Sequence, residues 1–114
     1  MRIDWVRRHC LSMPHATESV QWGDNLVFKV GGKIFAIVAL EPAKVWLSCK
    51  CASDVFGELV ERPGIVPAPY LARNHWIALE TEHAMSAAEI ELIIRRSYDL
   101  VIGKLPKKIR AALS

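Results

Sequence analysis

The chain has 114 residues, of which 52% are hydrophobic and 24% are charged. A chain of this length supplies one hydrophobic core, so we expect a single domain over residues 1–114, and the ordinary charge content excludes a disordered protein. The formal net charge of +3 and the sequence pI near 8.9 are milder than in a dedicated nucleic-acid-binding protein.

Residues 3–13 are predicted to form an amphipathic helix, because apolar residues recur at steps of three and four positions and a proline ends the run. Arg7 and Arg8 lie on the polar side of this helix. Residues 18–22 have the composition of a short strand, and residues 22–25 that of a turn. The N-terminal segment therefore predicts a helix followed by the first strand of a sheet.

Residues 27–40, with the sequence VFKVGGKIFAIVAL, are two β-rich runs separated by a pair of glycines. Both central residues of a type I′ turn need a positive φ, which glycine adopts without strain, so the pattern predicts a β-hairpin. Counting outward from the turn pairs Phe28 with Phe35 and places Leu26 and Ile37 on the same core face. A phosphate-binding loop would lead into a helix, whereas this sequence continues as a strand, so we interpret the glycines as a turn.

The middle of the chain predicts a strand, a helix, a loop and another strand. Residues 44–51, KVWLSCKC, alternate so that two cysteines lie on one face and Trp46 lies on the other. Residues 54–62 have the apolar spacing of a helix. Three prolines make residues 63–74 an extended surface loop that pairs poorly, and residues 75–80 return as a strand.

The C-terminal third predicts helices. Ser86 and Glu89 have the spacing of a capping box, and an apolar stripe follows at helical period, so we expect a long helix here. Pro106 breaks or kinks this helix, and residues 107–113 add a short basic turn of helix. The order of helices and antiparallel strands predicts an α+β domain with helices covering one face of the sheet.

Composition and spacing also restrict the location and the chemistry. The longest apolar run, residues 34–40, is far shorter than the roughly 20 residues that span a bilayer, so we expect a cytoplasmic protein with no membrane partner. The three cysteines are then expected to be reduced thiols. Cys49 and Cys51 lack a second ligand pair for zinc unless the fold brings Cys10 and His9 to them, so we expect neither a metal nor a cofactor.

Four histidines are the candidate general bases, and no nucleophile motif accompanies them, so we expect no enzymatic activity. An acid–base pair of one histidine with Asp24 is the catalytic alternative.

Basic residues gather near the hairpin turn, on the first helix and at the C-terminus, where they suit contact with a phosphate backbone. These candidate nucleic-acid-binding residues are Lys29, Lys33, Arg7, Arg8, Lys107, Lys108 and Arg110. The rival hypothesis is a protein or small-ligand interaction module, in which the proline-rich loop of residues 63–74 joins an exposed Trp22 or Trp46 in an apolar recognition patch.

Three segments in this order, LVFKVGGKIFA, PAPYLARNHWIAL and SYDLVIGKLPKKIR, closely resemble the MmcQ/YjbR family of small bacterial proteins. The resemblance covers essentially the whole chain and implies a "double wing" fold, a curved antiparallel sheet that carries helices. It also implies DNA as the partner, because the family is described as DNA-binding on the basis of its fold. Two positions depart from the family pattern, since Leu71 replaces a histidine and Asn74 replaces a lysine.

Overall fold

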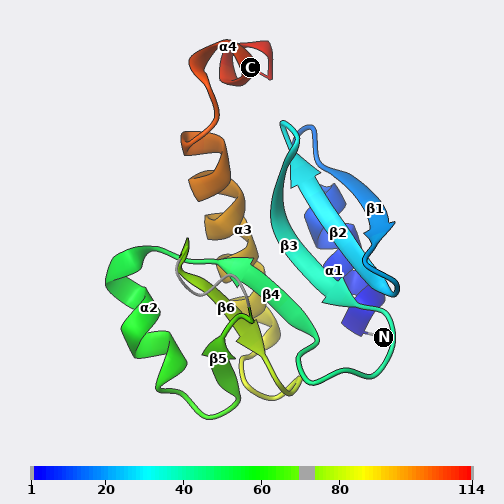
Figure 1. The fold of residues 1–114 in the computed structure, drawn as a ribbon, viewed down its shortest axis with the longest axis vertical. Coiled ribbons are helices and arrows are strands. Elements are labelled where there is room, and N and C mark those ends of the chain that lie inside the picture. Colours follow the sequence, from blue (N-terminus) through cyan, green and yellow to red (C-terminus); the bar gives the residue numbers. More distant parts are fainter. Residues whose placement is uncertain (1, 70–73, 114) are drawn as a thin grey trace.

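A computed structural model describes residues 2–69 and 74–113 of the chain. These residues form four helices and six strands, and Figure 1 shows how they are arranged. In chain order they are α1 (Arg2–Leu11), β1 (Thr17–Gln21), β2 (Asn25–Val30), β3 (Lys33–Ala39), β4 (Leu47–Lys50), α2 (Ser53–Val60), β5 (Ile65–Pro67), β6 (Trp76–Leu79), α3 (Ala87–Gly103) and α4 (Lys107–Ala112).

All six strands join one antiparallel sheet in the order β1-β2-β3-β4-β6-β5. The main core lies on one face of the sheet, where residues from α1, α2 and α3 pack against the strands. The opposite face carries a smaller cluster around Trp76 that is built from strand and loop residues. The predicted α+β domain with its helices on one face is confirmed.

The β2–β3 hairpin turns at Gly31 and Gly32, whose φ angles are +59° and +81°. The predicted turn is therefore correct, but the predicted register holds only close to it. Phe35 is an extra residue in β3, so Phe28 pairs with Ala36 across a β-bulge. Because this bulge reverses the alternation beyond it, Ile37 packs in the cluster on the opposite face and not, as predicted, in the main core.

Trp46 also differs from its prediction. The alternation of residues 44–51 places it opposite the cysteine face, yet it is only 5% exposed and packs in the main core beside Leu47. The regular strand β4 begins only at Leu47, so period-two alternation does not apply to the residues before it. Trp46 is consequently not an exposed recognition residue.

The proline-rich segment contains a strand that the sequence did not predict. β5 pairs with β6 at the end of the sheet order, with Ile65 opposite Leu79. An edge strand tolerates proline because one of its sides forms no ladder hydrogen bonds, which explains why Pro67 ends β5 without disrupting the sheet. Residues 70–73 of the predicted loop, including Leu71, lie outside the described residues.

α3 begins with the predicted capping box, in which the Ser86 side chain accepts from the Glu89 amide. Its Ser97 is fully buried and joins two strands. The Ser97 hydroxyl donates to the Phe35 carbonyl (O···O 2.6 Å) and accepts from the Lys50 amide (N···O 2.9 Å). The carbonyl belongs to the residue that the bulge adds to β3, so α3 supplies a partner for a backbone group at this irregularity.

Candidate functional site

The tip of the β2–β3 hairpin rests against the C-terminal end of the chain. A Cβ atom added at Gly31 would lie 2.6 Å from Leu105 Cδ1 and 3.3 Å from Ile109 Cγ2, so the turn touches the residue before Pro106 and a residue of α4. Figure 1 shows the hairpin reaching up toward α4. A glycine at this position permits both the positive φ and the close approach.

This contact places two distant segments that carry basic residues next to each other. We call them the hairpin–α4 surface, and its members are Lys29, Lys33, Lys107, Lys108 and Arg110. All are exposed except Lys29, which is half-buried. Neither residues 25–40 nor residues 100–113 contain an acidic residue, so both segments contribute charge of one sign.

The four lysines of the hairpin–α4 surface form no ion pair or side-chain hydrogen bond with the residues that the structure describes. Arg110 donates to the Gly103 carbonyl over 3.5 Å. Ammonium groups of this kind are available to a ligand with negative charge.

The two arginines of α1 lie apart from that arrangement. The Arg7 guanidinium donates to both carboxylate oxygens of Glu18 on β1, with an Nε···Oε1 distance of 2.7 Å. Hydrogen bonding and charge attraction to Glu18 raise the pKa of Arg7, so its charge is already compensated. Arg8 is exposed on the same helix, and no described contact connects it to the hairpin–α4 surface.

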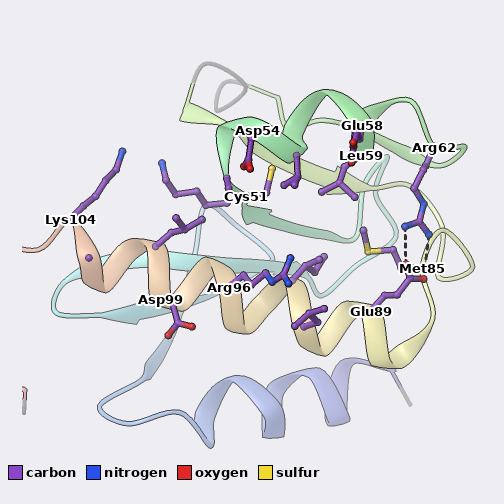
Figure 2. A pocket seen from close by; sticks show the side chains of 17 residues that line it. Cys51, Asp54, Glu58, Leu59, Arg62, Met85, Glu89, Arg96, Asp99 and Lys104 are labelled. Carbon is purple, nitrogen blue, oxygen red and sulfur yellow. Dashed lines mark hydrogen bonds and ion pairs between the residues drawn. The ribbon is translucent and has the colours of Figure 1, made fainter.

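A groove lies between α2 and α3, as Figure 2 shows. Its volume is about 750 Å³. Its floor is mostly apolar and includes Cys51, Val55, Leu59, Met85, Ile93 and Leu100. Charged residues line its rims. The sequence did not predict this groove, because the two helices that form it carry ordinary amphipathic patterns whose relative position depends on the tertiary fold.

Two of the charged groups on the groove rim form an ion pair across it. Arg62 Nη1 lies 2.8 Å from Glu89 Oε2, drawn as a dashed line in Figure 2. The hydrogen bonds from Arg62, and then the Ser86 backbone amide, lower the pKa of Glu89 to about 2. This pair links the turn after α2 to the first turn of α3 at one end of the groove.

The lysines at the far end of α3 have different surroundings. Burial, and then the charge of Lys104, lower the pKa of Lys50. Lys50 Nζ donates to the carbonyl of Asn74 over 2.9 Å, which is a neutral partner. Two ammonium groups therefore influence each other at one end of the groove.

The three cysteines are buried, and two of the histidines make contacts within the fold. Burial raises the pKa of Cys10 to about 12 and raises those of Cys49 and Cys51 as well. His9 contacts the Glu91 carbonyl at 3.0 Å, and His75 packs against Phe56. Within the described residues, no group of three or more His, Cys, Asp or Glu side chains is placed to hold a metal ion.

The parts of the predicted apolar recognition patch lie at opposite edges of the sheet. Trp22 is 64% exposed and follows β1, which is one edge strand, whereas the described part of the loop, residues 63–69, contains β5, the other edge strand. Together with the burial of Trp46, this separation leaves no patch of the predicted composition among the loop and tryptophan residues that the structure describes. None of the described helices is both long and apolar enough to cross a membrane.

Residues 11–100 of the chain match the sequence profile of the YjbR family. The chain belongs to this family. The resemblance to the MmcQ/YjbR family is thereby confirmed. Within the fold, Ser97 holds the backbone at the bulge and the Tyr98 hydroxyl donates to the Pro14 carbonyl over 2.6 Å, so this pair has a structural role.

Individual relatives support the same assignment. The "Uncharacterized protein YbdF" of Escherichia coli O157:H7 is 28% identical over 107 residues, which cover 90% of this chain and 86% of that protein. The crystal structure of protein DR2400 of Deinococcus radiodurans, with a DUF419 domain, superposes with a TM-score of 0.87 at 29% identity and covers 97% of this chain and 86% of that chain. A Pseudomonas syringae protein shares the fold at 23% identity, with a TM-score of 0.71 over 88% of this chain and 97% of that chain.

Proposed function

We propose that this protein binds duplex DNA through its phosphate backbone, using the hairpin–α4 surface. The observation that supports this proposal is the contact of Gly31 with Leu105 and Ile109, which places two acid-free basic segments next to each other. Lysines neutralise phosphates without reading base sequence, so binding of this kind has little sequence preference. The DNA partner implied by the family resemblance agrees with this function.

In this proposal the protein is a non-enzymatic, cytoplasmic binding domain that spans residues 1–114. The α1 residues of the predicted interface contribute unequally. Glu18 already neutralises Arg7, so Arg7 adds little, whereas Arg8 is exposed and contributes a separate positive charge on α1.

The test is the salt dependence of binding to a fluorescent duplex of random sequence, followed by anisotropy. Each phosphate neutralised contributes about 0.9 to the log–log slope, so five contacts predict a slope of about −4.5. Affinity then falls about 500-fold when the salt concentration rises from about 50 to about 200 mM. Lys33→Gln, Lys107→Gln and Lys108→Gln combined reduce the slope to about −1.8 if each residue contacts one phosphate.

The control is Lys44→Gln, which removes an exposed lysine from the loop after β3, at the opposite end of the sheet strands from the hairpin turn. It should leave the slope unchanged within error. Far-UV circular dichroism confirms that each variant is folded. The proposal is wrong if the protein does not bind duplex DNA at the lower salt concentration, or if the triple variant retains the full slope.

A further inference from the structure

The groove between α2 and α3 is an apolar surface that the described residues leave open. α2 has no fully buried residue, although Val55 and Leu59 pack partly against the main core. On the other side, Leu92 of α3 is 50% exposed. The volume of the groove, about 750 Å³, falls within the range of about 300–1,000 Å³ that is typical of small-molecule sites.

Ion pairs neutralise part of the groove's charge. Arg62 pairs with Glu89, and Asp99 pairs with Arg95 at 3.3 Å. The groove residues without a described ion pair are Asp54 and Glu58 on α2, Arg96 and Lys104 on or beside α3, and Lys50 at the end of β4. Asp54 and Glu58 lie on the α2 rim, as Figure 2 shows. Two of the basic residues, Lys50 and Lys104, are neighbours at one end of the groove.

The two lysines define what the groove end would accept. Lys50 is half-buried, its charge is disfavoured by burial and by Lys104, and its hydrogen-bond partner is a neutral carbonyl. No described carboxylate forms an ion pair with either lysine. An anion between the two ammonium groups would relieve their repulsion and accept two charge-assisted hydrogen bonds.

We propose that the α2–α3 groove binds a small amphiphile, whose apolar chain or ring lies on the groove floor and whose single carboxylate or phosphate lies between Lys50 and Lys104. The site shares no named residue with the hairpin–α4 surface, although Lys104 directly precedes Leu105, which contacts the hairpin turn, and it does not depend on DNA binding. The proposed ligand is a small molecule, as in the rival hypothesis, but its site lies between α2 and α3 and not at the proline-rich loop.

Isothermal titration calorimetry with four probes tests the proposal. The probes are decanoate, decyl phosphate, decanol and acetate, each kept below its micelle-forming concentration. At least one of the two anionic amphiphiles should bind saturably and at least about tenfold more tightly than decanol, because a hydrogen bond to a charged group contributes about a factor of ten or more. The tighter of the two identifies the head group. Acetate should not bind measurably, because it lacks the apolar chain.

Substitutions connect this binding to the groove. Lys50→Gln with Lys104→Gln should bring the affinities for the preferred anion and for decanol within about threefold of each other. Lys104 is exposed, so the single Lys104→Gln variant should fold normally and lose part of the discrimination. Lys107→Gln with Lys108→Gln removes the same charge from α4 and should leave amphiphile affinity unchanged. That control variant is also expected to weaken DNA binding, so failure of one proposal is distinguishable from failure of the other.

Cys51 provides a second readout, because it lines the groove and is 6% exposed. The bound amphiphile should slow its alkylation at least about threefold, measured by mass spectrometry of the peptide that contains it, without changing the alkylation of Cys10. The proposal is overturned if neither anion binds saturably, if decanol binds as tightly as both anions, or if the Lys104→Gln variant keeps the full discrimination.

Discussion

The contact between the hairpin turn and Leu105 can be tested by comparing two neighbouring glycines. Gly31 and Gly32 both have positive φ, but a Cβ at Gly32 would have no atom within 4 Å, whereas a Cβ at Gly31 would meet Leu105 Cδ1 at 2.6 Å. Gly32→Ala therefore introduces backbone strain alone. Gly31→Ala introduces the same kind of strain and in addition displaces a buried side chain.

The two costs can be estimated separately. Alanine in the left-handed region costs about 1–2 kcal/mol at either position. Displacing Leu105, which is only 4% exposed, adds an overpacking cost of about 1–3 kcal/mol at Gly31. For a domain of this size about 1 kcal/mol corresponds to about 4 °C in melting temperature. We therefore expect Gly31→Ala to melt about 4–12 °C below Gly32→Ala.

A double-mutant cycle identifies the cause. Leu105→Val removes both δ carbon atoms, so in that background the free energies of unfolding of the two alanine variants should differ by no more than about 0.5 kcal/mol. Urea denaturation followed by tryptophan fluorescence gives the four free energies. Equal destabilisation by Gly31→Ala and Gly32→Ala in the Leu105 background would refute the inferred contact, and with it the joining of the hairpin to α4.

Two further predictions follow from the ionisation of buried or paired groups. The folded pKa of Glu89 is about 2, below its ordinary value of 4.5, so its pairing stabilises the fold above about pH 4.5 and ceases to do so as the pH falls toward 2. Glu89→Gln should therefore have a lower melting temperature than the wild type at neutral pH, and the difference should disappear near pH 2. The control Glu91→Gln removes an exposed carboxylate from the same helix, and its melting temperature should show no such convergence with that of the wild type. Burial raises the pKa of all three cysteines. Iodoacetamide at pH 8 should therefore alkylate the native protein at least about a hundredfold more slowly than the protein unfolded in guanidinium. Rapid stoichiometric alkylation of the native protein would contradict the burial of the cysteines.

Local patterns allowed much of the fold to be predicted from the sequence. The two glycines, the capping box of Ser86 with Glu89, and Pro106 each determine backbone geometry within a few residues, and the structure has the expected turn, helix start and helix end at these places. Their effects depend on φ preferences and on hydrogen bonds between near neighbours, so they hold in many tertiary contexts.

Patterns that depend on distant contacts were less informative. The alternation in β3 does not reveal that Phe35 is a bulge residue, since a bulge is stabilised by its partner strand and by Ser97, which is 62 residues away. Prolines argued against a strand at residues 65–67, but an edge position makes that strand tolerable.

The candidate site shows the same division. Charge composition identified the lysines of the hairpin–α4 surface, yet only the Gly31 contact with Leu105 and Ile109 shows that the segments carrying them are neighbours. The groove, which brings Lys50 to Lys104 across 54 positions of sequence, had no local signal at all.

The hydrogen bonds of Ser97 have a mechanical consequence. One hydroxyl of α3 holds the carbonyl of Phe35, in the strand that leads from the hairpin turn, and the amide of Lys50, whose side chain lines the groove. Because both backbone groups bond to the same hydroxyl, a change in the tilt of α3 should shift β3 and the end of β4 together. Ser97 therefore ties the strand that leads from the hairpin turn to the strand that ends at the groove, and a substitution at position 97 should disturb both backbone groups at once.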